Sequence, residues 1–595
     1  MQKALSLLLV LSVLACSTPK EKIPDTPAMP GTTKKMVVYQ MMTRLFANTN
    51  TTNKFCGSVE DNGVGKMNNI NDAALKGIKG LGVTHVWYTG IIEHALLTDY
   101  SKNGIAIDDA DVVKGKAGSP YAIKDYYDVN PDLAVDVANR MKEFEALVAR
   151  THAQDLKVII DFVPNHVARA YKSDARPTGV KDLGEGDDIT VSFRPTNNFY
   201  YLPGQAFVAP KRPYQPEAPK SDGKFVENPA KVTGNNQFTA TPNLGDWFET
   251  VKLNYGVDYQ NGEKKHFEPV PDTWEKMRDI LVYWADKKID GFRCDMAEMV
   301  PVEFWQWVIP QVKKVNPQII FIAEIYNPTQ YRNYIDNGQF DFLYDKVQLY
   351  DTLRLLVNQK AHSDGIPKIQ ESLTGINHNM LHFLENHDEQ RFASPFFAGD
   401  AWKAVPAMVV SACIDEGPIM IYFGQEVGEP GAKAEGFSGD DGRTTMFDYW
   451  GVPQHQKWVN NLQYDGGLLS DEQKQLRQFY GDILTLAANN QAIAQGKYAD
   501  LTVFNQQKGN FSSLVHAFVR YHGEEKLIIV SNFNTKTEGV KIQIPESLAQ
   551  DLGLKQGSAY VGRDLLRSGA EIGIDANLTM SFEIPAFSSL ILKVK

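Results

Sequence analysis

Eight short apolar runs, separated by stretches with helical periodicity, are the feature that most restricts the fold of this chain. Each run has the length and the β-branched or aromatic content of a buried strand. The runs occupy residues 37–41, 84–89, 157–163, 290–295, 319–325, 341–346, 380–386 and 418–424. Amphipathic segments such as residues 135–153 and 273–288 lie between them. Strands that alternate with helices form parallel sheets, so eight such units predict a closed (β/α)8 barrel of the TIM type.

Acidic residues stand at or near the ends of four of these runs. They are Asp161, Asp295, Glu324 and Asp388. In a (β/α)8 barrel the C-terminal ends of all strands meet at one face, where active sites lie. Carboxylates that converge there suit glycosidic bond cleavage, because one can protonate the leaving oxygen while another attacks or shields the anomeric carbon.

Two departures from the regular alternation predict further domains in this chain of 595 residues. Residues 167–259 lack a clear β/α unit and are rich in Pro, Gly, Asn and Asp, so we expect an inserted subdomain over the barrel mouth. The barrel would then comprise residues 36–166 and 260–494. Strand-like runs at 501–506, 513–522, 526–534, 539–545 and 581–595 predict a C-terminal β-sandwich over residues 495–595.

The first residues have the pattern of a secretion signal. Lys3 precedes an apolar run that ends at Cys16 and is too short for the roughly 20 residues that span a bilayer. The segment VLAC resembles a bacterial lipobox, which implies a lipoprotein signal peptide over residues 1–16 and lipidation of Cys16. Residues 17–35, rich in Pro, Thr and Lys, would form a flexible tether. The alternative is a plain secreted protein that is cleaved after Ala15.

Charge and cysteine content narrow the range of partners. The net charge of −11 argues against nucleic acid, which binds basic surfaces. Three further cysteines, at positions 56, 294 and 413, form neither a disulfide framework nor a metal-ligand spacing. Cys294 lies inside a predicted strand, and we expect a small buried side chain there instead of a nucleophile.

Four segments carry a resemblance to a known enzyme family. They are DFVPNH at 161–166, GFRCDMAEM at 291–299, FIAEIY at 321–326 and FLENHD at 383–388. From about residue 36 to its C-terminus the chain resembles the α-amylase family, glycoside hydrolase family 13, and it is similar to envelope-anchored bacterial members. The resemblance implies that Asp295 is the nucleophile of a covalent glycosyl intermediate and that Glu324 is the general acid/base. Asp388 would stabilise the transition state.

The same resemblance implies which residues bind the substrate. His166 and His387 would hydrogen-bond the sugar in the cleavage subsite, and Tyr121 in the segment PYAIKDYY would stack on it. A structural histidine and a core aromatic are the alternatives for these positions. Asp161 is expected to organise the side chain of Arg293 without reacting.

Arg293 lies two residues before Asp295 and therefore shares a strand face with it. A fixed cation at this position would keep the nucleophile ionised and oriented. We expect the pKa of Glu324 to be raised by an apolar wall and by nearby negative charge. Tyr326 and Phe321 are the candidates for that wall.

Many family members bind calcium, and this chain departs from their ligand pattern. Asn165 matches one ligand, which makes it a structural support and the one candidate metal ligand, but the family's histidine four residues after the nucleophile is Met299. Lys252 and Lys66 stand where carboxylates of two calcium loops occur in relatives. Calcium takes about six to eight oxygen ligands, several of them charged. We therefore expect no required cofactor, with bound calcium as the alternative.

Three further features bear on specificity. Glu298 replaces a lysine that family enzymes carry near the leaving-group subsites. Met296 stands where enzymes that cleave α-1,6 bonds often have valine, which favours α-1,4 cleavage. The segment DGRTTMFDYW at 441–450 either places Asp441 and Arg443 near the substrate or forms a solvated loop.

Together these features predict a retaining hydrolase that cleaves α-1,4 bonds in starch-like α-glucans and maltooligosaccharides. It would be lipid-anchored to a bacterial envelope, at the outer membrane or cell surface, with a periplasmic or secreted enzyme as alternative. A transglycosylase or cyclomaltodextrinase shares the covalent intermediate and stays open. A non-catalytic glycan-binding lipoprotein would be favoured if one of the three carboxylates were missing, and none is.

Overall fold

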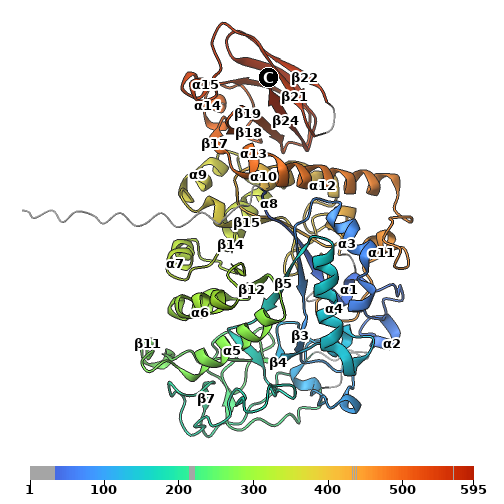
Figure 1. Cartoon of the computed structure of the whole chain (residues 1–595), viewed down its shortest axis with the longest axis vertical. Coiled ribbons are helices and arrows are strands. Elements are labelled where there is room, and N and C mark those ends of the chain that lie inside the picture. The colour runs from blue at the N-terminus through green and yellow to red at the C-terminus, as the bar shows by residue number, and fades with distance from the viewer. Residues whose placement is uncertain (1–33, 213–220, 432, 434–435, 437–438, 567–568) are drawn as a thin grey trace, which may run out of the picture.

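The computed structural model describes residues 34–212, 221–431, 433, 436, 439–566 and 569–595. At its centre is a closed barrel of eight parallel strands (Figure 1). In order around the barrel they are β1 (Val37–Met42), β16 (Ile419–Tyr422), β15 (Met380–Phe383), β14 (Phe342–Tyr344), β13 (Ile320–Ala323), β12 (Gly291–Cys294), β5 (Lys157–Phe162) and β2 (His85–Thr89). Each strand coincides with one predicted run, so the predicted (β/α)8 barrel is confirmed.

Alternation along these strands separates an inner core from an outer core. Val38, Trp87 and Ile159 belong to a buried cluster that fills the barrel. Their sequence neighbours, such as Tyr39 and Ile160, pack in the larger cluster shared with the helices. Every second side chain of a strand points into the barrel. The last inward side chain of each strand therefore lies at the C-terminal mouth, and this alternation positions the active-site residues.

Helices cover the outside of the barrel, and most of them bury one face, whereas Val405–Cys413 is buried along its whole length. The longest are α4 (Arg140–Ala153), α5 (Asp272–Asp286), α6 (Val302–Val315) and α12 (Asp471–Asn489), and shorter ones include α3 (Asp72–Lys79), α7 (Tyr331–Asp336), α8 (Asp351–Val357) and α10 (Val405–Cys413). In α5 the buried side chains recur every three or four residues, as in Trp274, Met277, Leu281 and Trp284. Helix α4 lies within the first segment whose periodicity predicted a helix, and α5 lies within the second apart from its first residue.

The segment after β5 forms short antiparallel pairs in place of a β/α unit. β6 (His166–Ala168) pairs with β9 (Thr250–Lys252), β7 (Tyr201–Leu202) with β8 (Ala230–Lys231), and β10 (Val257–Asp258) with β11 (Lys264–Lys265). Tyr200, Phe207 and Val232 belong to a small core of its own. This inserted subdomain, at the end of the molecule opposite the C-terminal strands in Figure 1, confirms the predicted insertion. The exact limits 167 and 259 stay predictions.

The C-terminal region is all-β apart from short helices, as predicted. β17 (Lys497–Asp500), β18 (Val515–His522), β19 (Glu525–Asn532), β24 (Ser588–Val594), β21 (Tyr560–Asp564) and β22 (Glu571–Ile574) form one sheet, and β20 (Glu538–Gln543) pairs with β23 (Thr579–Ile584) in a second. Side chains of both sheets, such as Ile528 and Ile542, share one buried core. Two sheets around a common core form a sandwich.

One expected strand of this region is wrong. Residues 501–506 were expected as a strand, and Thr502–Gln507 form helix α14 instead. The Asp500 carboxylate accepts the N–H groups of Thr502 and Val503 at 2.9 Å each. A side-chain acceptor for the first free N–H groups favours a helix start over strand pairing.

The predicted signal peptide, the lipidation site Cys16 and most of the 17–35 tether lie outside the described residues. Where the description begins, Lys35 is buried and donates Nζ to the carbonyl oxygens of Ala412 and Asp415 at 2.9 and 2.7 Å. In the described part of the chain, no helix has both the length and the apolar character that crossing a membrane requires.

Candidate active site

Three carboxylates meet one guanidinium at the C-terminal ends of β5, β12 and β13. Arg293 is fully buried, and its Nη1 donates to Asp295 Oδ1 at 2.9 Å and lies 3.5 Å from Asp161 Oδ1. Its Nη2 lies 2.8 Å from Glu324 Oε1, and its Nε donates to Tyr344 OH at 3.2 Å. One planar cation therefore fixes the positions of Asp295 and Glu324 relative to each other.

Asp295 and Glu324 follow adjacent parallel strands. Cys294 is paired in register with Ala323, so the next residue of each strand stands beside the other. The Glu324 N–H donates to Cys294 O at 3.1 Å. Neighbouring strands lie about 4.8 Å apart. Side chains from such neighbouring strand ends can bring their carboxyls within roughly 5 Å, the separation in retaining glycosidases, whereas inverting enzymes need roughly 6.5–9.5 Å.

Glu324 is held by two further donors. Tyr326 OH donates to Oε1 at 2.7 Å, and the Met296 N–H donates to Oε2 at 2.8 Å. Met296 has a φ of 41°, which non-glycine residues rarely adopt and which aims its N–H at the carboxyl. Burial raises the pKa of Glu324 to about 7; Arg293 opposes this shift and the neighbouring carboxylates add to it. The direction of this shift is the expected one, but Tyr326 contacts Glu324 through its hydroxyl and not as an apolar wall, and a hydrogen bond to the carboxylate favours its ionised form.

Asp295 has one engaged oxygen and one free oxygen. Oδ1 accepts from Arg293, whereas Oδ2 is buried without a hydrogen-bond partner among the described residues. Burial raises the pKa of Asp295 to about 6, with Arg293 opposing and Asp388 and Asp161 adding to the shift. An unpartnered buried acceptor costs free energy unless a ligand uses it. Oδ2 therefore marks the position where a substrate atom would approach.

Asp388 follows β15 and is held beside His387. Its Oδ2 lies 3.0 Å from His387 Nε2, and its N–H donates to Asn386 Oδ1 at 2.9 Å. Burial alone would raise the pKa of Asp388, but His387, Arg293 and Arg443 together hold it below the ordinary value. Of Asp295, Glu324 and Asp388, Asp388 is thus the one whose carboxyl group stays ionised most readily.

Tyr121 links Asp161 to His387 on the other side of Arg293. Its OH lies 2.6 Å from His387 Nε2 and donates to Asp161 Oδ1 at 3.3 Å, and its ring stacks on the imidazole at 5.0 Å. Trp87 Nε1 donates to Asp161 Oδ2 at 2.9 Å, and Gln40 Nε2 lies 2.7 Å from His387 Nδ1. Sequence reasoning missed Gln40 and Trp87. Their inward parity on β1 and β2 was the signal that could have found them.

His166 lies where β6 leaves the barrel for the inserted subdomain. It is buried, and its ring centroid lies 5.2 Å from that of Trp247. Burial lowers the pKa of His166 to about 3, so the imidazole is neutral. A neutral ring can both donate and accept a hydrogen bond.

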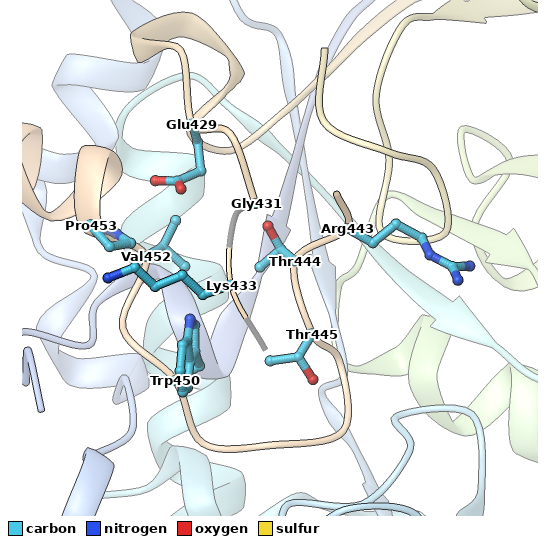
Figure 2. A pocket seen from close by; sticks show the side chains of 9 residues that line it. All are labelled: Glu429, Gly431, Lys433, Arg443, Thr444, Thr445, Trp450, Val452 and Pro453. Carbon is cyan, nitrogen blue, oxygen red and sulfur yellow. The ribbon is translucent and has the colours of Figure 1, made fainter. Parts of the chain in front are cut away.

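The segment 441–450 places one cation near the carboxylates. In Figure 2 the side chain of Arg443 extends away from the small cavity lined by Glu429, Trp450 and Pro453. Arg443 pairs with Asp441 at 2.6 Å, and its charge contributes to the lowered pKa of Asp388. The segment thus lies near Asp388, and contact of Asp441 or Arg443 with the substrate stays a prediction.

Phe321 and Cys294 do not face the site. Phe321 was expected to wall Glu324, but it packs in the outer core, where its ring lies 6.5 Å from that of Phe340. Phe321 lies three positions before Glu324, an odd number, so the two side chains leave opposite faces of the chain at β13. Cys294 is a buried free thiol of the same outer core.

Comparison with known proteins identifies the family. The model of the α-amylase catalytic domain matches residues 40–466. The chain belongs to the α-amylase family, glycoside hydrolase family 13. It is similar to alpha-amylase 3 of Dictyoglomus thermophilum, 23% identical over 527 residues that cover 84% of this chain and 85% of the relative.

Other relatives of this family member differ in activity. A cyclomaltodextrin glucanotransferase of Thermoanaerobacterium thermosulfurigenes is 23% identical over 415 residues, which cover 66% of this chain and 49% of that protein. The crystal structure of the α-amylase from Geobacillus thermoleovorans, complexed with acarbose, aligns with a TM-score of 0.59 at 18% identity and covers 95% of this chain and 99% of that one. The family is therefore established, while the product pattern is not fixed by these similarities.

A lysine takes the place of the calcium ion that the α-amylase family implies beside Asn165. Lys252 donates Nζ to Asn165 Oδ1 and, at 3.0 Å, to the carbonyl oxygen of Met299. Among the described residues no carboxylate forms an ion pair with Lys252. At the second expected loop, Lys66 donates Nζ to Asp132 O at 2.6 Å. These donor sets do not fit calcium, and we assign no catalytic step to it.

Replacement of Lys252 by methionine tests this arrangement. The variant removes the ammonium and leaves Asn165 Oδ1 and Met299 O without their buried donor. We expect a loss of about 1–3 kcal/mol in the free energy of unfolding, measured by urea titration, with no recovery on addition of calcium. Lys264→Met, at an exposed position of β11, is the control. Recovery of stability with calcium would show that the position is a metal site after all.

Proposed function

We propose that this α-amylase-family enzyme is a retaining hydrolase of α-1,4-glucosidic bonds in starch-like glucans and maltooligosaccharides, acting within chains or releasing maltooligosaccharides. The geometry around Arg293 carries the proposal: Asp295 and Glu324 follow adjacent strands and share its guanidinium, and Asp295 Oδ2 is buried without a donor among the described residues. The pKa of Asp388 is lowered, that of Asp295 is about 6, and that of Glu324 is about 7. Between pH 6 and 7 two carboxylates are ionised while one holds a proton, which is the state that a retaining mechanism requires.

In the proposed reaction, Asp295 Oδ2 attacks the anomeric carbon while Glu324 gives its proton to the glycosidic oxygen. The bond to the leaving sugar breaks and a glycosyl ester of Asp295 forms. Glu324, now ionised, removes a proton from water, which attacks the ester and regenerates Asp295. Asp388 stabilises the positive charge that develops on the sugar ring, and Tyr121 provides a stacking surface.

The pH dependence of kcat/KM follows from the same values. The nucleophile must be deprotonated, so activity rises with pH through the pKa of Asp295 near 6. The acid must be protonated, so activity falls as pH rises through the pKa of Glu324 near 7. We expect a narrow bell with its maximum between these values, measured with maltoheptaose. Activity that keeps rising above pH 8 would contradict the assignment of Glu324 as acid.

Product analysis on soluble starch, pullulan and maltoheptaose tests the proposed substrate class. The hydrolase should shorten starch to maltooligosaccharides and cleave maltoheptaose with retained anomeric configuration. Release of products from pullulan through its α-1,6 linkages, without cleavage of starch, would contradict α-1,4 specificity. Absence of turnover on all three glucans would contradict the proposed function.

A transglycosylase or cyclomaltodextrinase is the second candidate. The cyclomaltodextrin glucanotransferase among the relatives supports it, as does Glu298, which replaces the expected lysine. Glu298 Oε2 accepts the N–H groups of Tyr326 and Asn327 at 3.1 Å each, so a negative charge lies just beyond the end of β13. Oligosaccharides longer than maltoheptaose among its products would favour this candidate.

We also propose that the enzyme is anchored by lipid at Cys16 to a bacterial envelope. The apolar run ending in VLAC supports this, and residues 17–33 would connect Cys16 to the barrel. Expression in a bacterial host should place the enzyme in the membrane fraction, and Cys16→Ser should release it to the soluble fraction. Equal membrane association of both forms would contradict lipidation at Cys16.

A further inference from the structure

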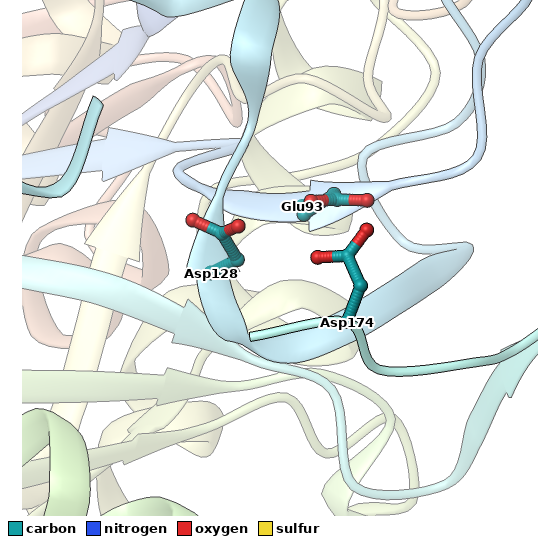
Figure 3. A group of neighbouring side chains, drawn as sticks. All are labelled: Glu93, Asp128 and Asp174. Carbon is teal, nitrogen blue, oxygen red and sulfur yellow. The ribbon is translucent and has the colours of Figure 1, made fainter. Parts of the chain in front are cut away.

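A second group of acidic side chains lies apart from the active-site carboxylates, where a hairpin meets the inserted subdomain. Glu93 is on β3 (Ile92–His94), Asp128 is on β4 (Ile123–Val129), and Asp174 is in the loop after β6. In Figure 3 the carboxylates of Glu93 and Asp174 face each other, with Asp128 beside them. One oxygen from each of the three side chains lies within 4.8 Å of the other two.

Glu93 has no partner in the described polypeptide. Its side chain belongs to a residue that is 1% exposed, and neither Oε1 nor Oε2 has a hydrogen-bond donor among the described residues. Burial of an uncompensated carboxylate costs several kcal/mol, so such a group takes up a cation or a proton. Burial raises the pKa of Glu93 to about 9, and the charges of Asp128, Asp174 and Asp125 add to this shift, whereas Lys124, which pairs with Asp108, opposes it.

The surrounding side chains compensate the cluster only in part. Arg140 Nε donates to both oxygens of Asp128 at 2.9 Å, which neutralises one of the three charges. The nearby Asp125 carboxylate is engaged by Ser173 Oγ at 2.6 Å and by the Asp174 N–H at 2.8 Å. These hydrogen bonds hold the loop of Asp174 against β4 but bring no positive charge to Glu93.

We propose that Glu93, Asp128 and Asp174 bind a hard divalent cation, with calcium as the ion of choice. Calcium takes carboxylate oxygens at about 2.3–2.6 Å, so ligands on opposite sides of the ion lie roughly 4.6–5.2 Å apart. Oxygens within 4.8 Å of one another fit this sphere. Asp174 is exposed, which leaves one side of the ion open to water ligands.

The ion would cross-link three segments that are distant in sequence. It joins β3 and β4 to the first loop of the inserted subdomain. Tyr121 lies two residues before β4, so the same cross-link supports the residue that contacts His387 in the active site. This position differs from the one beside Asn165, where the Lys252 ammonium stands.

Calcium titration of the full chain after treatment with a chelator tests the proposal. We expect isothermal titration with calcium chloride to show one ion per chain at this cluster, with magnesium binding more weakly, and calcium to raise the Tm. Glu93→Gln and Asp174→Asn should each weaken binding by more than about 10-fold, because even the loss of a residue that supports a metal ligand has an effect of that size. Glu524→Gln, with a fully exposed side chain, should bind as the parent does.

Two results would overturn the proposal. The first is an absence of calcium and magnesium binding at millimolar concentration, which would mean that a proton neutralises Glu93. The second is calcium binding of unchanged affinity in both variants, which would locate the ion elsewhere. Because the Asp174 side chain is exposed, Asp174→Asn keeps the test valid even if Glu93→Gln fails to fold.

Discussion

The Asp295→Asn enzyme should lose at least about 10⁴-fold in kcat on maltoheptaose and keep its fold. Asparagine has the shape of aspartate, and its amide oxygen can still accept from Arg293 Nη1. The position of Oδ2 is then occupied by an amide nitrogen that cannot attack the anomeric carbon. Initial rates, together with circular dichroism of the variant, measure both parts of this expectation.

Restoration of activity by a small anion tests specifically whether Asp295 is the nucleophile. For this test Asp295→Ala removes the carboxylate, and azide can enter the space it leaves and attack the anomeric carbon from the same side, which should give a glycosyl azide of inverted configuration. Asp471→Asn, a side chain that is 97% exposed, is the matched control and should keep its activity. The assignment fails if Asp295→Asn retains activity within about 10-fold of the parent enzyme.

The Glu324→Gln enzyme should lose about 10²–10⁴-fold in kcat/KM on maltooligosaccharides. Glutamine has the shape of glutamate but one acceptor oxygen in place of two, so it can keep the hydrogen bond from the Met296 N–H or the one from Tyr326 OH. It has no proton to give to the leaving oxygen. A substrate with an acidic phenol as leaving group needs no such proton, and its loss in the first step should be much smaller.

The pH profile of this variant provides an independent readout. With the activated substrate, the fall in activity above pH 7 should disappear, because the titrating acid is gone. The rise near pH 6 should remain, since it belongs to Asp295. Equal losses for both substrates, or an unchanged fall above pH 7, would mean that another group donates the proton. Glu524→Gln should show the parent profile.

The barrel and the positions of its three carboxylates were predictable because they depend on local patterns. Strand runs show as apolar segments of fixed length, and residues two apart share a face. From that parity alone, Arg293 and Asp295 could be placed together at the end of β12. The same alternation predicts that Phe321 faces the helices. The expectation that Phe321 forms an apolar wall beside Glu324 did not follow this rule and is wrong.

The position of residues 501–506 shows where local pattern is insufficient. Their apolar alternation suits a strand as well as a short helix. The choice depends on Asp500, whose carboxylate accepts two free N–H groups and starts α14. Such a contact competes with the hydrogen bonds of a sheet. The helix and the strand differ by a small free energy, which cannot be read from the composition of the segment.

The sequence by itself determined the order of strands and helices, the family of the chain and the acidic residues of its site. Only the tertiary structure decided that Lys252 donates to Asn165 across 87 positions of sequence and that Glu93 lies beside Asp174 without a donor from the part of the chain that the structure describes. The physical reason is the range of the interactions. Periodicity and parity are set by neighbours along the chain, whereas the compensation of a buried charge depends on which distant segments pack around it.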